Sequence, residues 1–597
     1  MIARMLNDHM IKVVSLIVLT SLVVQALVGG TLGAVGSDSD DMMRLLQVRD
    51  FFNGQSWFDL HQYRLGSDGT LMHWSRVPDL PLIVLIAVAD LFLPYEQAEI
   101  VGYSVWPLLC AVLVAFGLIT AARRVGGTAL VGVTAILTIA FLFKHFRFAP
   151  GAIDHHNLQL ALLAIAIGGL VDPLRRRWSF AMAGAALGLT FTIGMEIYVF
   201  SAVLCAGAAC LWAFLGDDVV PAVRAFGLAF AGTLAIIFVG TVAPQNYLAV
   251  YCDAYSSIIL GAGLVAGVGL AALSTLVKGS QVVRFGALAG LGAVCLILIL
   301  AAAPQCLSNP LAALPDDAKH LWLDNVKEAK PLWALPESPF VLAPYMLGVQ
   351  FLALGLSGYQ VWRRRDVAFN GLFTALMAAT ILFTVYQARF LHFGFLFSIL
   401  PLAVWVARFY ERARETGGDR SGAILALGAS LPLVWALPFG IIETSFASED
   451  ENPVYDIEDL AGIKGCYGPA IIGALNELPA GLIAAAPNAA PALLSETQHR
   501  VLTGNYHRNV DGIVDGIRVF TYPPEKAAAR LRANGVDYML FCYPSNFMRF
   551  LEREYEDGLV AYLARGDVPD FLELAANPQI MDEGRTETVQ LYRVVTP

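Results

Sequence analysis

The chain has 597 residues, of which 57% are hydrophobic and 15% are charged, and its mean hydropathy is +0.62. Soluble globular proteins carry about 25% charged residues, so this composition excludes an ordinary soluble domain and indicates a polytopic membrane protein. The formal net charge is −10 at pH 7, without a basic tail or another nucleic-acid signature. We therefore expect no nucleic-acid partner.

The first apolar run predicts a membrane-spanning helix over 11–33. No small-residue cleavage site closes this run, so we interpret it as a signal anchor and not as a cleavable signal peptide. The polar stretch from Asp38 to Asp59 follows directly, with further carboxylates at Asp40 and Asp41. Like charges this close repel one another unless a cation or a bound ligand compensates them. The ordinary alternative is a solvated loop that ends a helix.

Further apolar segments bring the expected number of spans to about thirteen. They cover 97–121, 127–143, 157–171, 178–193, 197–215, 222–243, 258–276, 283–303, 340–362, 367–385, 391–407 and 422–442. Another apolar run, Leu80–Leu93, is short and rich in proline. We expect an interfacial or re-entrant helix there.

Arginine and lysine residues predict the orientation of these spans. They gather in alternate loops, at 123–124, 175–177, 278–284, 363–365 and 408–414. The positive-inside rule makes these loops cytoplasmic. The loops that then face outward are 34–96, 144–156, 244–257, 304–339 and 386–390. We expect a multi-pass protein of the inner (plasma) membrane with its C-terminal part on the periplasmic side.

The composition changes near Glu443, and residues 446–597 contain no further span. Apolar runs typical of strands alternate there with helical ones, which predicts a small α/β domain. The expected fold class is a polytopic α-helical membrane domain over 1–445, followed by a periplasmic α/β domain over 446–597.

The eight cysteines divide according to this topology. Four lie in predicted spans, where core packing is their ordinary role. The other four lie in or beside outward-facing segments, where an oxidising compartment permits disulfides. Cys252–Cys306 and Cys466–Cys542 are the candidate bridges. Four free thiols are the alternative, because no spacing rule selects these pairs.

The outward loop 144–156 carries the strongest candidate site. Asp154, His155 and His156 are adjacent there, and Arg147 precedes them. Carboxylate oxygens and imidazole nitrogens at a membrane edge suit Mn²⁺ or Mg²⁺. Helix capping would explain the aspartate but leaves the histidines unexplained.

Three other features lie in or near outward loops. The segment from Asp324 to Glu328 in loop 304–339 reads by itself as a polar helix face. Arg389 is the single arginine of the short outward loop 386–390; a phosphate and a structural salt bridge are comparable candidates for its partner. Glu196 interrupts an apolar run, where a carboxylate at bilayer depth costs about 2.5–3.5 kcal/mol. Glu196 could be catalytic, but we rank it below the other features.

In this order and topology, these features resemble the catalytic subunit of oligosaccharyltransferase, a GT-C glycosyltransferase. The stretch Gly151-Ala-Ile-Asp154-His155-His156 matches the Gly-x-x-Asp-His-His motif of archaeal members. Asn325-Val-Lys-Glu328 is loosely similar to the motif of a mobile outer loop in that family. The resemblance covers residues 1–445. The family's Trp-Trp-Asp motif, which reads the acceptor sequon, is absent after residue 445.

The resemblance implies a GT-C-like fold of thirteen spans and transfer of a sugar or oligosaccharide from a polyprenyl-(pyro)phosphate carrier to an acceptor on the periplasmic face. It implies that the catalytic residues are Asp40, Asp154 and Glu328, with Asp40 favoured over Asp41 as the base. A divalent metal, Mn²⁺ or Mg²⁺, would be held by Asp40, Asp154 and His156. The donor phosphate would be bound by Arg389 and Arg147. Further candidates for the site are Asp41, His155 and Glu196.

Alternatives to this reading remain open at the level of sequence. A related GT-C enzyme could use a lipid-monophosphate sugar without a metal. A transporter or flippase of envelope lipids would instead place its charged residues at mid-membrane, between inverted repeats. A non-catalytic envelope scaffold is a further alternative. The acceptor can be a glycan, a lipid or a protein on these grounds.

Overall fold

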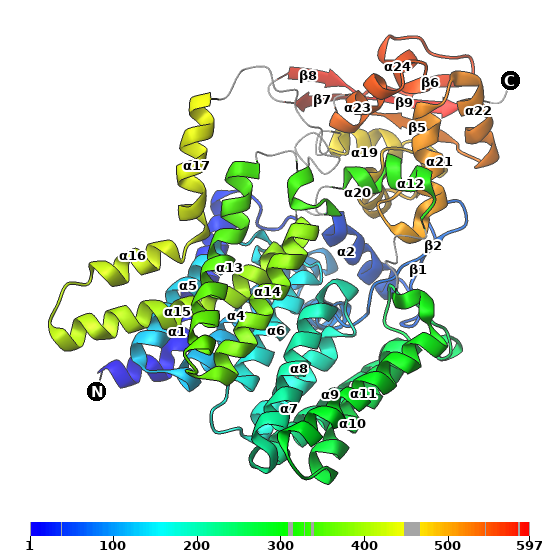
Figure 1. The fold of residues 1–597 in the computed structure, drawn as a ribbon. Coiled ribbons are helices and arrows are strands. Elements are labelled where there is room, and N and C mark those ends of the chain that lie inside the picture. Colours follow the sequence, from blue (N-terminus) through cyan, green and yellow to red (C-terminus); the bar gives the residue numbers. More distant parts are fainter. Residues whose placement is uncertain are drawn as a thin grey trace. The chain divides into compact units, whose positions relative to one another are not determined.

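The computed structural model describes residues 2–36, 39–307, 314–326, 329–335, 339–446, 466–543, 545–582 and 585–595 (Figure 1). The chain divides into two compact units. The first, called here the helical unit, comprises 1–36, 74–310 and 331–449. The second, called here the sheet unit, comprises 37–73, 311–330 and 450–597. The domain predicted over 1–445 therefore loses two of its outward segments to the sheet unit.

The long helices of the helical unit coincide with the predicted spans (Figure 1). They are α1 (Ile2–Val28), α4 (Tyr95–Val125), α5 (Thr128–Lys144), α6 (His156–Leu170), α7 (Arg177–Thr190), α8 (Tyr198–Leu215), α9 (Val220–Thr241), α10 (Ser257–Leu276), α11 (Gln281–Ala302), α13 (Pro339–Trp362), α14 (Val367–Tyr386), α15 (Leu391–Thr416), α16 (Ser421–Ala429) and α17 (Pro432–Phe446). A shorter helix, α3 (Asp79–Asp90), occupies the proline-rich run. Its interfacial position stays a prediction.

The structure does not confirm the expected number of thirteen spans. Within the described residues, eight helical stretches are long and apolar enough to cross a membrane, or up to nine if the bent pair α16 and α17 counts as one span. The stretch Met195–Thr241 counts once although it contains both α8 and α9. Helices α5, α6 and α7 have 17, 15 and 14 residues. They rise only about 21–26 Å, less than the hydrocarbon core of about 30 Å. The count of thirteen is therefore not confirmed.

Small residues allow neighbouring helices of this unit to approach closely. A side chain on Gly117 of α4 would collide with the backbone of Ala164 in α6. In the same way, a side chain on Gly184 of α7 would meet the backbone of Phe226 in α9. Membrane helices associate through such close packing, because lipid supplies no hydrophobic drive between them.

A cluster of five phenylalanine rings, called here the Phe200 cluster, joins four elements of the helical unit. Phe200 of α8 is fully buried. Its ring centroid lies 5.0–6.3 Å from those of four other rings. These are Phe383 of α14, Phe390 of the 3₁₀ turn η10 (Ala388–Phe390), and Phe393 and Phe397 of α15. Offset and edge-on ring pairs of this kind favour one fixed arrangement.

The sheet unit confirms the predicted α/β character of the C-terminal segment (Figure 1). Its five-stranded sheet has the order β4-β3-β5-β9-β6. The strands are β3 (Leu482–Ala484), β4 (Arg500–Val501), β5 (Tyr538–Phe541), β6 (Leu572–Ala576) and β9 (Gln590–Val594). The first three are parallel, and β9 is antiparallel to both β5 and β6. Two further strand pairs are β1 (His61–Gln62) with β2 (Thr70–Leu71), and β7 (Gln579–Asp582) with β8 (Arg585–Thr588).

Helices lie before β3 and between the strands from β3 to β6 along the chain. They are α19 (Pro469–Asn476), α20 (Ala490–Glu496), α21 (Val510–Thr521), α22 (Pro524–Ala533), α23 (Asn546–Glu554) and α24 (Leu559–Ala564). Apolar side chains from α21, α22 and β5 form one buried core, with Ile517, Leu531 and Phe541 at most 1% exposed.

The first outward loop is built into the sheet unit. Its helix α2 (Ser39–Phe52) packs against α20. Arg64 donates hydrogen bonds to the carbonyls of Leu494 at 2.6 Å and Thr497 at 2.7 Å, which caps the C-terminal end of α20. Leu65 forms an isolated parallel bridge with Val501 of β4. The loop thus adds backbone hydrogen bonds at the edge strand.

Part of the third outward loop also belongs to the core of the sheet unit. Helix α12 (Asp316–Leu321) and the residue that follows it place Ala318 and Trp322 in that core. The Trp322 indole donates a hydrogen bond to Asn505 Oδ1 at 3.1 Å. Through these contacts, the segment 311–330 belongs to the same compact unit as the C-terminal residues.

Both cysteine pairs named from the sequence are bridged. Cys252 and Cys306 join the two ends of the α10–α11 hairpin, with a Cα–Cα distance of 4.9 Å. Cys466 and Cys542 are joined within the sheet unit, with a Cα–Cα distance of 5.7 Å. Both distances fall in the ordinary range for disulfides.

Candidate functional site

The loop between α5 and α6 is shaped by one glycine and one asparagine. Gly151 has φ +94°, and a side chain there would collide with the carbonyl of Ala34. Its carbonyl accepts a hydrogen bond from the Gly36 N–H at 2.8 Å. Asn157 donates to the carbonyls of Ala152 at 2.8 Å and Arg147 at 3.3 Å. These bonds fold the loop back on itself, so that Arg147 and the residues after Gly151 lie together.

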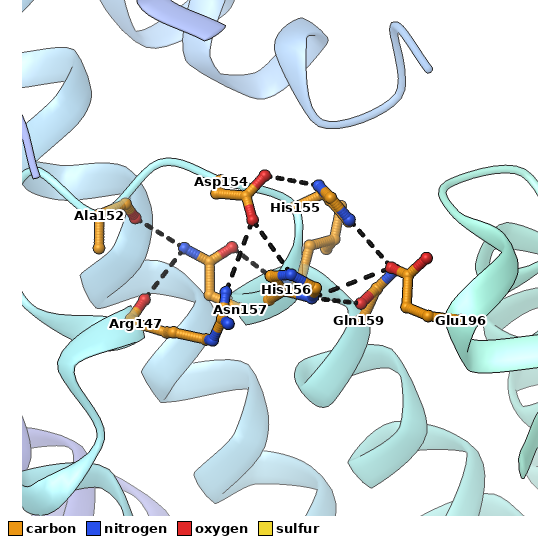
Figure 2. A network of polar contacts seen from close by, with 9 residues as sticks. Arg147, Ala152, Asp154, His155, His156, Asn157, Gln159 and Glu196 are labelled. Carbon is orange, nitrogen blue, oxygen red and sulfur yellow. Dashed lines mark hydrogen bonds and ion pairs between the residues drawn. The ribbon is translucent and has the colours of Figure 1, made fainter. Parts of the chain in front are cut away.

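A polar cluster forms at the start of α6 (Figure 2). Asp154 Oδ1 lies 2.5 Å from His155 Nδ1, and Asp154 Oδ2 lies 3.4 Å from His156 Nε2. Arg147 Nη1 lies 3.6 Å from Asp154 Oδ2. Asp154 is 6% exposed and Arg147 is 8% exposed. The sequence predicted these four residues as neighbours, and the structure brings them together.

Glu196 completes the cluster from a different part of the chain. It lies in the 3₁₀ turn η2 (Met195–Ile197), before α8. Its Oε1 is 2.9 Å from His155 Nε2 and 3.9 Å from His156 Nδ1. Gln159, one turn into α6, also donates to this oxygen. Figure 2 shows the ring of His155 between the carboxylates of Asp154 and Glu196.

Glu196 and Gln159 were underrated or missed from the sequence. Glu196 was ranked last among the candidates, and Gln159 was not considered. For Gln159 the available signal was its spacing from His155: it follows His155 at i+4 and therefore lies on the same face of α6. No local pattern in the sequence indicates that η2 lies close to α6.

The charges of the cluster are divided unequally between the two histidines. Burial alone would lower the pKa of His155, but the carboxylates of Asp154 and Glu196 outweigh burial and raise that pKa to about 10. Burial, together with the positive charges of Arg147 and His155, lowers the pKa of His156 to about 4. His155 is therefore the protonated member. His156 keeps a neutral ring with one lone pair available to a metal.

The cluster fits a divalent cation by its donor set. One ligand atom from each of Asp154, His155 and His156 lies within 4.8 Å of the others. Mixed nitrogen and carboxylate donors suit Mn²⁺ better than Mg²⁺, which prefers oxygen ligands. Because both ring nitrogens of His155 face carboxylates, Asp154, His156 and Glu196 are the residues that could hold the ion. His155 would then orient the two carboxylates.

Arg389 lies in η10, directly before α15. The ring of His392, the second residue of α15, contacts that of His145 at the end of α5 in a tilted arrangement, with 4.3 Å between ring centroids. The start of α15 therefore lies beside the loop that carries Arg147. Neither His145 nor His392 was selected from the sequence.

The other predicted site residues lie elsewhere. Asp40 and Asp41 are at the start of α2 in the sheet unit, where Asp41 is 3% exposed. Their place beside Asp154 stays a prediction. Glu328 and Asp38 lie outside the described residues.

Comparison of the sequence with protein-family models and with curated proteins finds no match. Among solved structures, the chain is similar to the archaeal oligosaccharyltransferase AglB from Archaeoglobus fulgidus in complex with an inhibitory peptide and a dolichol-phosphate. The TM-score is 0.64 at 14% identity, over 98% of this chain and 74% of that chain.

Two further structures of the same archaeal enzyme are also similar. One is tethered with an acceptor peptide containing the NVT sequon, with a TM-score of 0.60 at 14% identity over 98% of this chain and 74% of that chain. The other is a complex with Zn and sulfate, with a TM-score of 0.57 at 14% identity over 95% and 72%. At this identity the likeness shows the fold. The resemblance of the fold to that of an oligosaccharyltransferase, expected from the sequence, is therefore confirmed.

Proposed function

We propose that the protein is a membrane glycosyltransferase that moves a sugar or oligosaccharide from a polyprenyl-(pyro)phosphate carrier to an acceptor on the periplasmic face of the inner membrane. The observation that carries this proposal is the buried cluster of Asp154, His155, His156, Glu196 and Arg147 at the ends of apolar helices. Its occurrence in a fold shared with an archaeal oligosaccharyltransferase supports the same reading.

The residues of the cluster, together with Arg389, have three kinds of role in this proposal. Arg147 and Arg389 bind the phosphate of the donor, since guanidinium groups match phosphate geometry. Asp154, His156 and Glu196 would hold a divalent metal, which would stabilise negative charge on the leaving phosphate. His155 keeps the two carboxylates oriented. The position of these groups at the ends of apolar helices supports access by a lipid-borne headgroup.

Asp40 is proposed as the group that accepts the proton of the acceptor nucleophile. This role rests on the sequence resemblance and on the position of Asp40 in the first outward loop. Glu328 keeps its proposed catalytic role on the basis of the sequence resemblance alone.

The test is the fate of the donor in cells that lack the protein. We expect a polyprenyl-linked glycan to accumulate, and wild-type protein to clear it. Asp154→Asn should fail to clear it, whereas the exposed control Asp217→Asn should behave as wild type, because Asp217 forms an exposed surface pair with Lys278. Normal levels of all lipid-linked glycans in the deletion strain would refute the proposal. Clearance by purified protein that survives chelators would favour the metal-free, lipid-monophosphate alternative.

A further inference from the structure

Two histidines beside the polar cluster have no role in the proposal so far. His145 follows the last residue of α5, and His392 lies near the start of α15. Their ring centroids are 4.3 Å apart. His145 is 6% exposed, and neither of its ring nitrogens has a hydrogen-bond partner among the residues that the structure describes. Buried polar groups without a partner are rare in native proteins.

The apolar surroundings of His145 make the absence of hydrogen bonds to its ring nitrogens, among the described residues, more unusual. Three phenylalanine rings contact its ring, those of Phe141, Phe146 and Phe148, with centroids at 5.1–5.9 Å. Apolar rings cannot replace the hydrogen bonds that the imidazole would make in water. Phenylalanine at this position would have provided the same packing. The imidazole is therefore expected to serve a partner that comes from outside the described chain.

The nearby charges favour an anion as that partner. Arg147 follows His145 by two residues, and its guanidinium lies 5.2 Å from the ring of Phe146. Arg389 precedes His392 by three residues, in the turn that leads into α15. Within the described part of the chain, no hydrogen bond or ion pair joins either histidine to a carboxylate. A site with cationic neighbours attracts anions and repels metal ions.

The protonation state of His145 agrees with this reading. Burial lowers its pKa well below the ordinary value, and the positive charges of Arg147 and His156 lower it further. The ring is therefore neutral and offers one N–H donor. A neutral donor next to a guanidinium can bind a phosphate oxygen without adding another buried charge.

We propose that His145 and His392 bind a phosphate group through their ring N–H groups, beside Arg147. The inference rests on the proposed function, which supplies that phosphate as part of the lipid-linked donor. A free phosphate or pyrophosphate has the same chemistry, so the test must separate the lipid-borne ligand from the soluble one. The two histidines are then binding residues for the headgroup, distinct from the metal-holding residues Asp154, His156 and Glu196.

Binding to the full chain in lipid nanodiscs tests the proposal. Native mass spectrometry would compare polyprenyl phosphate with polyprenol, which lacks the phosphate. Wild type should prefer the phosphate. His145→Phe and His392→Phe should each weaken binding of polyprenyl phosphate by about tenfold, the usual cost of one hydrogen bond to a charged group, and leave polyprenol unchanged. Inorganic pyrophosphate should compete with polyprenyl phosphate in wild type and much less in His145→Phe.

Two controls separate this inference from folding and from the metal site. His320→Phe alters a histidine in the sheet unit whose side chain is 81% exposed, so it should bind as wild type does. Mn²⁺ binding, followed by electron paramagnetic resonance, should persist in His145→Phe. His145→Asn, which keeps an N–H donor, should restore part of the preference for phosphate and serves if the phenylalanine variant does not fold.

Two results would overturn the inference. If both phenylalanine variants keep the preference of wild type, the histidines do not bind phosphate, while the proposed function stands. If wild type itself binds polyprenyl phosphate no better than polyprenol, then the inference fails together with the proposed donor. Competition by pyrophosphate without any preference for the lipid would identify a site for soluble phosphate and contradict the lipid-linked assignment.

Discussion

At the scale of single residues, the ring of His155 explains why two carboxylates can be buried together. Asp154 and Glu196 would repel each other, but each faces one nitrogen of the same protonated ring, at 2.5 Å and 2.9 Å. A buried charge is tolerated only when it is paired and hydrogen-bonded. The carboxylates are therefore held in place by His155 and remain available on their other lone pairs.

Glu196→Gln should weaken metal binding while the fold is retained. The substitution keeps the shape of the side chain but removes its charge, so both the ion and His155 lose an anionic partner. We expect the affinity for Mn²⁺ to fall about 10–100-fold, as for other residues that hold or orient metal ligands, and transfer activity to fall with it. Electron paramagnetic resonance of Mn²⁺ measures the first effect. Unchanged affinity would remove Glu196 from the site.

Asp172 gives a prediction about pH that is independent of this site. It lies in the loop after α6, with hydrogen bonds from Arg176 Nε at 2.8 Å and Ser179 Oγ at 2.6 Å. Although burial by itself raises the pKa of Asp172, these hydrogen bonds and the charge of Arg124 outweigh it and lower the pKa to about 2. A lowered pKa stabilises the folded state above the unfolded value near 4, and this contribution disappears as the pH falls toward 2.

Asp172→Asn should therefore destabilise the protein most at neutral pH. At neutral pH we expect the free energy of unfolding to fall by about 1.5–3 kcal/mol, the range for a hydrogen bond to a charged group. The difference from wild type should become smaller as the pH falls from 4 to 2. Unfolding of detergent-solubilised protein at several pH values measures it. A constant difference between the variant and wild type over this range would show that the charge of Asp172 is not responsible.

At the scale of elements, the loop from α5 to α6 shows why its motif begins with glycine. Gly151 combines a positive φ with close contact to the backbone of Ala34. Both conditions exclude a side chain. The segment after α1 and the residues before α6 are thereby joined through backbone hydrogen bonds.

Gly151→Ala should destabilise the protein by more than about 1 kcal/mol, because alanine is strained at this φ and displaces Ala34. The loop should shift, so Mn²⁺ affinity should fall as well. Gly132→Ala is the matched control. Gly132 lies within α5 with nothing within 4 Å of the added carbon, so alanine should be neutral or stabilising by up to about 1 kcal/mol. Thermal unfolding compares the two variants, and equal effects would contradict the argument.

The elements also show which parts of the fold could be predicted. Long apolar runs determine their own helices, so each predicted span contains helix in the structure, although the span 422–442 is divided between α16 and α17. The alternation of apolar strand-like runs with helical ones likewise predicted the α/β character of the residues from 466 onward. By contrast, the addition of α2 and α12 to that unit depends on contacts such as Leu65 with Val501 and Trp322 with Asn505. Nothing in the local sequence encodes such distant pairings. Glu196 was underrated for the same reason.

At the scale of the whole molecule, the disulfides and the topology can be tested together. Each disulfide lies within one unit, and all four cysteines fall on the side predicted to face outward. Because disulfides form in oxidising compartments, bridged cysteines would support the outward orientation of these segments.

Mass spectrometry of non-reduced peptides should recover Cys252 linked to Cys306 and Cys466 linked to Cys542. Cys110 is the internal control, because its buried thiol should remain free. Recovery of Cys252 as a free thiol from protein made in its native membrane would contradict both the bridge and the outward loop.

A reporter enzyme that is active only outside the cytoplasm should be active when fused at about residue 450, if the positive-inside pattern sets the orientation. A second fusion in the arginine-rich segment 363–365 should be inactive. Reversed activities would place the polar cluster on the cytoplasmic side and would refute the proposed periplasmic reaction.

The Phe200 cluster has a consequence for the genetics of this protein. Phe200 follows Glu196 by four residues, and Phe390 follows Arg389 directly, so the contact between these two rings links the segment that carries Glu196 to the turn that carries Arg389. An unbiased screen for inactive variants should therefore recover substitutions at Phe200, although its side chain has no polar atom. Suppressors of such substitutions should occur among the partner rings of α14 and α15. Activity would then depend on compatible combinations of the packed phenylalanine side chains as well as on the polar residues.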